Sequence, residues 1–137
     1  MKKILRLLIC SFLIITITGC LKDNSYTIDI FDLEEIISIS IDTLEQSNNL
    51  KEFSDKETIN TIYDIFQDKT TYTQSINDNP TDPDTLYFIT FKNKDNELKS
   101  VYVYQKNSNY YIEQPYNGIY ELSKADFLII ASLANND

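Results

Sequence analysis

The fold is decided by three apolar runs, Leu86-Tyr-Phe-Ile-Thr-Phe91, Val101-Tyr-Val-Tyr104 and Tyr110-Tyr-Ile112. The polar segments that separate them, residues 92–97 and 106–109, are short and have the composition of turns. Because consecutive strands joined by short turns pair antiparallel, the three runs predict a meander. A tight turn at Asn117-Gly118 leads to one more predicted strand, residues 119–122.

Upstream of the meander, the sequence predicts a pair of strands and a helix. Residues 37–41 read Ile-Ser-Ile-Ser-Ile, an alternation typical of a strand with one buried face. Leu50–Phe53 is expected to return antiparallel to this strand. The sequence Ser54-Asp-Lys-Glu57 matches a capping box, in which the Ser hydroxyl and the Glu carboxylate accept from free amides at a helix start. We therefore expect a helix over residues 55–67.

Beyond this helix, the sequence predicts an edge strand, a loop and a last helix. Residues 70–76 are rich in Thr and Tyr, as strands are. Residues 78–84 contain two prolines, which remove amide donors, and are expected to form a loop. Ser123 is the expected cap of an apolar helical stripe from Phe127 to Ala134. The fold class is α+β, a mostly antiparallel sheet with one helix within the strand order and a C-terminal helix packed on one face.

The N-terminus has the parts of a secretion signal. Residues 1–6 carry three basic side chains, and residues 7–17 form an apolar run. About 11 helical residues at about 1.5 Å each fall well short of the ~30 Å hydrocarbon layer, so this run does not predict a permanent span. Residues 17–20, Ile-Thr-Gly-Cys, resemble the lipobox of bacterial lipoproteins. The resemblance implies cleavage after Gly19 and lipidation of Cys20.

These patterns divide the chain into three segments. They are a signal peptide over residues 1–19, a lipidated cysteine and tether over residues 20–31, and a single α+β domain over residues 32–134. Two or three acyl chains would hold the protein on the extracytoplasmic face of the cell membrane. The abundance of Ile, Asn, Lys and Tyr is typical of AT-rich genomes and indicates a low-GC Gram-positive bacterium.

Composition argues against several partners and chemistries. Removal of the three basic residues of the signal leaves nine Lys against 21 acidic residues, a net charge of −12, so nucleic acid is not an expected partner. The sequence contains no His, Cys10 lies in the signal and Cys20 carries the lipid, which leaves no imidazole or free thiol for catalysis. We therefore expect no enzymatic activity, no catalytic residues, no cofactor and no metal.

Two acidic groups were weighed against that expectation. Asp78, Asp82 and Asp84 offer oxygen ligands for Ca²⁺, but their spacing matches no EF-hand, and a solvated turn is the favoured interpretation. Glu113 and Glu121 could form a glycosidase pair, but nothing in their spacing requires it. Neither group outweighs the expectation of a non-enzymatic domain.

Tyrosines are concentrated in the second half of the predicted sheet. On one strand Tyr102 and Tyr104 share a face, while Val101 and Val103 share the other. If the Val face packs on the helices, both phenol rings point outward and form a candidate binding surface. Cross-strand aromatic pairing on an exposed sheet face is the favoured structural interpretation.

Residues 110–120, Tyr-Tyr-Ile-Glu-Gln-Pro-Tyr-Asn-Gly-Ile-Tyr, resemble the signature of a small domain family of unknown function. That family occurs in Gram-positive lipoproteins and membrane proteins, and the resemblance covers about residues 32–133. Some relatives are attached to antirepressor-type membrane metallopeptidases, which implies a sensing or binding role and supplies no catalytic residue. The motif extends the candidate binding surface to Glu113, Gln114, Tyr116 and Tyr120. Pro115 and Gly118 would fix a bend, so a structural role for the motif is favoured.

Two functions are compatible with these patterns. The first is a non-enzymatic binding or accessory domain at the cell surface, which contacts an envelope protein through the Tyr-rich face. The second is an extracytoplasmic sensor of a small ligand, a peptide or a wall fragment, bound near residues 113–120. In both cases the membrane is a partner through the N-terminal lipid.

Overall fold

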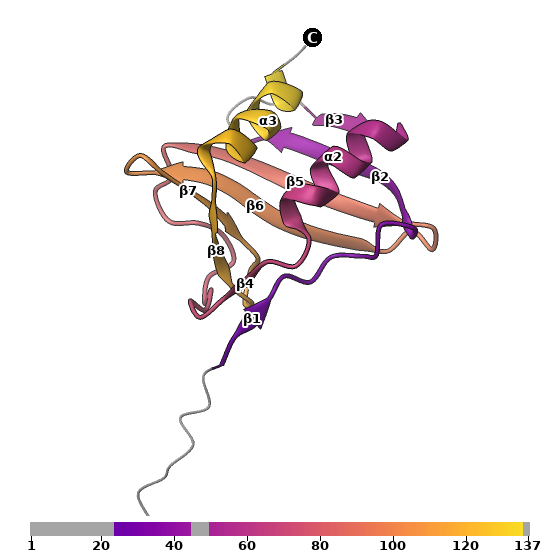
Figure 1. The fold of residues 1–137 in the computed structure, drawn as a ribbon. Coiled ribbons are helices and arrows are strands. Elements are labelled where there is room, and N and C mark those ends of the chain that lie inside the picture. The colour runs from indigo at the N-terminus through magenta and orange to yellow at the C-terminus, as the bar shows by residue number, and fades with distance from the viewer. Residues whose placement is uncertain (1–23, 45–49, 136–137) are drawn as a thin grey trace, which may run out of the picture.

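Eight strands and two helices make up the described residues, 24–44 and 50–135, of this computed structural model (Figure 1). They are β1 (Tyr26–Thr27), β2 (Ile36–Thr43), β3 (Leu50–Phe53), α2 (Lys56–Phe66), β4 (Thr70–Thr71), β5 (Thr85–Asn93), β6 (Leu98–Lys106), β7 (Asn109–Glu113), β8 (Ile119–Leu122) and α3 (Lys124–Asn135). The fold is α+β, as the sequence predicts. The predicted signal peptide and Cys20 lie outside the described residues. Neither described helix is long and apolar enough to cross a membrane.

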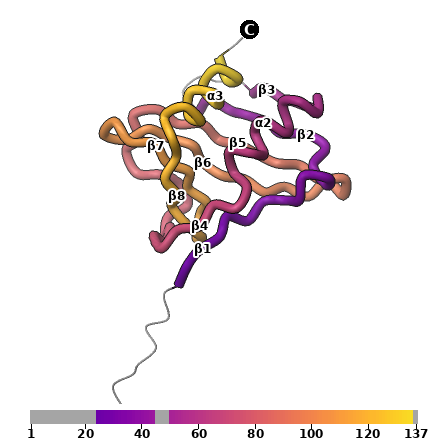
Figure 2. Tube along the Cα trace, in the orientation of Figure 1, coloured from indigo at the N-terminus to yellow at the C-terminus, as the bar shows by residue number. Residues whose placement is uncertain are grey.

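Six strands form the main sheet, in the order β3-β2-β5-β6-β7-β8, and each neighbouring pair is antiparallel. The strands from β5 to β8 are neighbours both along the chain and in the sheet, which confirms the predicted meander. Between β3 and β5 the chain leaves the sheet, forms α2 and β4, and returns beside β2 (Figure 2).

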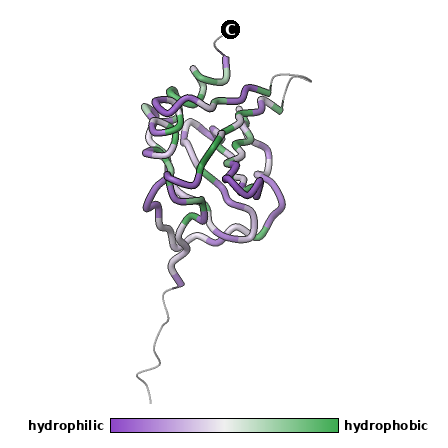
Figure 3. Tube along the Cα trace, turned by 90° about the vertical axis from the view of Figure 1, so that its right-hand side faces the viewer, coloured by the Kyte–Doolittle hydropathy of each residue, from purple (hydrophilic) through white to green (hydrophobic). Residues whose placement is uncertain are grey.

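Both helices pack on the same face of this sheet (Figure 1), and the core lies between them and the strands. Val101, Val103 and Ile112 point to this face and have no exposed surface. Phe66 of α2 meets Phe91 of β5 edge to face, with ring centroids 5.4 Å apart. Burying a side chain of this kind contributes about 1.5–3 kcal/mol. Figure 3 shows hydrophobic stretches along the strands and helices and mostly hydrophilic connections.

The first long strand departs from strict alternation. We expected Ile37, Ile39 and Ile41 to share the buried face, but Ile37 is 39% exposed while the other two have no exposed surface. The register of β2 against β5 shifts between Ile36 and Ser38, as in a β-bulge. The shift turns Ile36 to the core and Ile37 away from it, so the alternation is correct only after the bulge.

The two predicted helix starts have different outcomes. α2 is capped by Asp55 rather than by Ser54, because the Thr58 N–H donates to Asp55 Oδ1 at 2.8 Å. The hydrogen bonds from Thr58 also lower the pKa of Asp55. At α3 the expected cap is correct, since the Asp126 N–H donates to Ser123 Oγ at 3.0 Å.

Residues 24–31, most of the segment that the sequence assigns to the tether, are part of the fold. β1 pairs with β4 in a small second sheet, and both lie near the end of β8 (Figure 1). Ile28 and Phe31 are each 7% exposed and belong to the hydrophobic core. The segment is too short to show a clear period, so its burial depends on contacts that the sequence pattern does not display.

The predicted edge strand over residues 70–76 is much shorter in the structure. Only Thr70–Thr71 is a strand, and it pairs with β1 rather than lengthening the main sheet. Ser75 and Pro80, in the segment that follows, are both buried. This segment therefore packs on the protein, although it has no regular structure.

Candidate functional site

Tyr102 and Tyr104 lie on the sheet face opposite to the one that the two described helices cover. Each packs against a ring on a neighbouring strand. Phe88 and Tyr102 have centroids 5.0 Å apart, and Tyr104 and Tyr111 have centroids 5.4 Å apart. Tyr104 is only 6% exposed, so the prediction that both phenol rings point into solvent is wrong for this residue. Tyr102 remains half-buried.

A buried carboxylate on the same face joins β7 to the chain after β4. Glu113 and Ser75 are both buried, with 2% and 1% of their surface exposed. Glu113 Oε1 accepts a hydrogen bond of 2.6 Å from Ser75 Oγ. Burial and the adjacent Glu113 carboxylate raise the pKa of Tyr104. The sequence motif placed Glu113 in the candidate binding surface. Its carboxylate instead joins two segments that are 38 residues apart.

Gln114 and Asn117 hold a second segment, the N-terminal one. The Asp29 N–H donates to Gln114 Oε1, and Gln114 Nε2 donates to the Asp29 carbonyl, both at 2.8 Å. Asn117 Nδ2 donates to the Thr27 carbonyl at 2.9 Å and to Gln114 Oε1 at 2.7 Å. The Gln114 amide thus pairs with both backbone groups of Asp29, as a strand neighbour would. We call Glu113, Gln114 and Asn117 the clasp.

The turn that presents the clasp is formed by residues 114–118. Tyr116 has a φ of 59°, in the left-handed region, whereas Gly118 does not have a positive φ. The reason for glycine at 118 is space, because a Cβ there would lie 2.8 Å from Thr71 Cγ2 and from the Tyr120 ring. Tyr116 is 63% exposed and its hydroxyl donates to Asp78 Oδ1, which raises the pKa of Tyr116.

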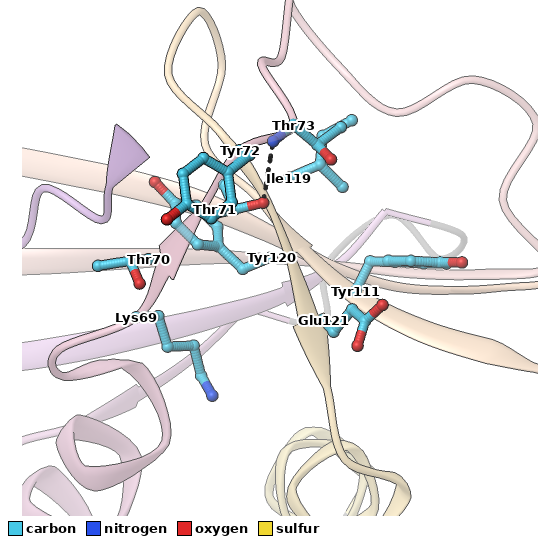
Figure 4. A pocket seen from close by; sticks show the side chains of 9 residues that line it. All are labelled: Lys69, Thr70, Thr71, Tyr72, Thr73, Tyr111, Ile119, Tyr120 and Glu121. Atoms are coloured by element: carbon cyan, nitrogen blue, oxygen red, sulfur yellow. Dashed lines mark hydrogen bonds between the residues drawn. The ribbon is translucent and has the colours of Figure 1, made fainter. Parts of the chain in front are cut away.

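A pocket of about 500 Å³ opens beside the clasp, between residues 69–73 and β8 (Figure 4). Its lining residues are Lys69, Thr70, Thr71, Tyr72, Thr73, Tyr111, Ile119, Tyr120 and Glu121. Lys69 and Glu121 come from the two different segments that border the pocket, and their side chains form no ion pair with a described residue. Tyr72 is 75% exposed.

Tyr120 contributes an unusual polar atom to this pocket. The residue is 1% exposed, yet its hydroxyl has no hydrogen-bond partner among the described residues. Burial, together with the negative charge of Asp29, raises the pKa of Tyr120 to about 12. An unpaired buried hydroxyl costs about 1–3 kcal/mol, so Tyr120 carries an uncompensated polar group inside the fold.

The other acidic candidates do not converge on one point. Asp78 accepts from Tyr116, and Asp84 Oδ2 accepts from the Asn107 N–H at 2.9 Å. No group of three His, Cys, Asp or Glu side chains in the described ranges could hold a metal ion. Glu113 pairs across the sheet with Ile119, and Glu121 pairs with Tyr111, so the two carboxylates are not directly opposite each other.

The sequence named four residues of the motif but missed one side of the pocket. Residues 69–73 carry no motif, and the pattern assigned residues 70–76 to an edge strand. Their place beside β8 is set by the pairing of β4 with β1 and by a hydrogen bond of 2.9 Å from the Ile119 N–H to the Thr73 carbonyl. The only signal in the sequence is the run of Thr and Tyr side chains at residues 70–73.

Comparisons with known proteins give a family and a structural relative. Residues 24–121 match DUF5301, a domain of unknown function. An NMR structure of a protein from Ruminococcus gnavus is similar to this chain, with 32% sequence identity and a TM-score of 0.58. The similarity covers 73% of this chain and 98% of that one. No curated protein matches the chain.

Proposed function

Since the chain belongs to the DUF5301 family of domains of unknown function, we propose that it is a non-enzymatic binding domain, anchored by lipid to the extracytoplasmic face of the cell membrane. The N-terminal signal and the lipobox-like residues that end at Cys20 support the anchor. The family match begins at residue 24, close behind that cysteine, so the lipid would hold the domain near the bilayer.

The clasp supports a role in binding rather than in catalysis. A carboxyl group that acts as a general acid or base must be able to reach a substrate. Glu113 is buried and bonded to Ser75, and Gln114 is bonded to backbone groups of Asp29. The polar groups of the motif are therefore already used to hold the fold together.

The pocket between residues 69–73 and β8 is the observation that carries the proposal. Its volume of about 500 Å³ falls in the usual range for ligand sites. Unlike the clasp, it is lined by charged groups without partners in the described chain, the Lys69 ammonium and the Glu121 carboxylate. Charged side chains without partners around a pocket can bind a ligand and fix its orientation.

Photo-cross-linking in intact cells tests the binding site. A photoreactive residue replaces Tyr72 at the pocket rim or, as the matched control, Leu128 on α3, which is 53% exposed. We expect the Tyr72 position to capture a molecule that the Leu128 position does not. Identical products at both positions would contradict a binding role for the pocket.

Mass spectrometry of the protein purified from membranes tests the anchor. The proposal predicts a mature chain that begins at Cys20 and carries a diacylglyceryl group. Cys20→Ala should abolish both the lipid and the cleavage after Gly19. An unmodified Cys20, or cleavage at another position, would contradict lipid anchoring.

A second candidate surface is favoured by the ring pair of Phe88 and Tyr102. Both side chains are half-buried on the sheet face that no described helix covers, and partly exposed aromatic rings are common anchors of protein interfaces. An envelope protein is the expected partner there. Tyr102→Ala should remove that partner from a cross-linking capture, whereas Tyr104 is too buried to serve in the test.

A further inference from the structure

We propose that the open edge of β8 binds a basic peptide segment by strand addition, with the peptide antiparallel to β8 and opposite Glu121. The inference rests on the proposed binding function of the pocket and names the chemical class of its ligand. Four features of the described residues support it: the direction of the β8 backbone groups, the course of residues 69–73, the size of the pocket and the charge of the chain.

The outer edge of β8 is paired with another segment only at its first residues. Gln74 and Gly118 form an antiparallel bridge, and the Ile119 N–H donates to the Thr73 carbonyl at 2.9 Å. Backbone groups of every second residue point to the same side of a strand. The Ile119 carbonyl and both backbone groups of Glu121 therefore point the same way as the Ile119 N–H. No described residue forms a hydrogen bond with these three groups.

The ladder stops because its next residues are used elsewhere. Continued in the same register, it would place Thr71 opposite Glu121, but Thr71 is paired with Tyr26 of β1. The Thr73 N–H donates to Thr71 Oγ1 at 3.1 Å, which closes a local turn (Figure 4). The segment thus lies apart from β8 before Thr73 and joins its edge only at Thr73 and Gln74, and the pocket lies in the wedge between them.

An extended peptide can satisfy the free backbone groups of this wedge. In an antiparallel pair, facing residues of the hydrogen-bonded type exchange both N–H···O bonds. One peptide residue opposite Glu121 would accept from its N–H and donate to its carbonyl. A segment that adds to a sheet edge obtains affinity from main-chain bonds and selectivity from the side-chain pockets. The pocket volume of about 500 Å³ is large enough for a few peptide residues.

Charge selects a basic segment among extended peptides. The chain after Gly19 has nine Lys against 21 acidic residues, and Glu121 presents an exposed carboxylate at the edge itself. Such an excess of negative charge attracts cations and repels anionic segments. Lys69, across the pocket, works against a basic ligand. The structure therefore predicts opposite effects for charge changes at the two positions.

The test uses the full-length chain in detergent micelles with three synthetic probes. The first is the acetylated and amidated hexapeptide Lys-Val-Thr-Lys-Val-Thr. The second has the same sequence with alternate amides N-methylated, which keeps the charge and removes half the donors. The third has Glu in place of Lys. The readout is amide hydrogen exchange resolved by NMR. We expect the first probe to slow exchange at Glu121 at least tenfold, and the other two to have no effect.

Variants of the edge separate the backbone from the side chain. Glu121→Pro removes the outward N–H. Glu121 forms no backbone hydrogen bond with β7, so the sheet should persist in this variant. Continued protection of the Ile112 amide from exchange would report an intact sheet. Glu121→Pro should abolish binding of the first probe. Glu121→Ala, the matched control, keeps the N–H and should weaken binding several-fold. Lys69→Glu should tighten it.

Three results would overturn the inference. The first is equal protection of Glu121 by the N-methylated probe, which excludes strand addition. The second is equal or tighter binding of the acidic probe, which excludes charge selection. The third is failure of all three probes at millimolar concentration, which rejects a peptide ligand. The cross-linking experiment at Tyr72 would still decide the proposed function, since a non-peptide molecule captured there supports the pocket and not the peptide.

Discussion

The clasp and the edge of β8 are a few residues apart in the chain and use their polar groups in opposite ways. At the clasp, Glu113, Gln114 and Asn117 each bond to a distant segment of the same domain. At the edge, the outward backbone groups of Glu121 have no described partner. A polar motif can therefore be the structural part of a region, while the adjacent, less distinctive residues are open to a ligand.

The difference follows from whether the polar groups are buried, as in the clasp, or can reach water, as at the edge of β8. A buried polar group without a partner costs about 1–3 kcal/mol, so buried carboxylate and amide groups such as those of Glu113 and Gln114 require partners. An edge strand can leave its outward backbone groups to water at little cost. Variants that disrupt the clasp should consequently reduce stability, and variants at the edge should leave stability unchanged.

The largest effect is expected at the turn that presents the clasp. In Gly118→Ala, the new Cβ would meet Thr71 Cγ2 and the Tyr120 ring at 2.8 Å, and the ring is buried in the core. Overpacking of this kind should lower the free energy of unfolding by about 2–3 kcal/mol, measured by chemical denaturation. An unchanged midpoint would show that the fit around Gly118 is looser than the structure indicates.

Gln114→Ala should have the next largest effect. It removes the partner of both Asp29 backbone groups and one partner of Asn117, and we expect a loss of about 2 kcal/mol. Gln105→Ala, at a half-buried Gln on β6 whose side chain makes no comparable bonds, is the control and should change stability by less than about 0.5 kcal/mol. Equal effects at the two positions would remove the special role of the clasp.

Tyr120→Phe should raise the free energy of unfolding by about 1 kcal/mol at pH 7, because it removes a buried hydroxyl that has no partner. A second effect should appear at alkaline pH. The fold raises the pKa of Tyr120 to about 12, from 10 in the unfolded chain, so the folded state holds the proton more tightly. Stability from this group is complete below about pH 10 and is lost as the pH rises toward 12. The variant should lose less stability over that range in denaturation experiments, and an identical pH profile would contradict the assignment.

The smallest effect on stability is expected at the pocket rim. Tyr72 is 75% exposed and its side chain makes no hydrogen bond among the described residues, so Tyr72→Ala should change the unfolding free energy by less than about 0.5 kcal/mol. A thermal or chemical melt measures this. Substantial destabilisation would make the rim part of the fold, and the contrast with the clasp would fail.

Local patterns predicted the elements of this fold well. The alternation of residues 86–112 predicted the meander, and Ser123 predicted the start of α3, since both depend on neighbours in sequence. The β2 bulge, which turns Ile37 outward, has no signal in an uninterrupted alternation. The capping box at Ser54 was displaced by one residue, because Asp55 offers a carboxylate in the same place.

The candidate site was less predictable because it depends on segments far apart in the chain. Glu113 was named as part of a candidate binding surface, but its partner Ser75 lies 38 residues away in a segment with no period. Tyr104, which strand alternation alone assigned to solvent, is only 6% exposed. Residues 69–73 join the pocket only because β4 pairs with β1, and the sequence pattern had placed β1 in the tether.

Site-resolved amide hydrogen exchange of the free chain tests the central contrast most directly. The account predicts slow exchange at Asp29, whose N–H donates to the clasp, and at Ile119, whose N–H donates to Thr73. It predicts fast exchange at Glu121, whose N–H has no described partner and faces the pocket. Protection of Glu121 equal to that of Ile119 would show that the edge is already closed, and would contradict the account.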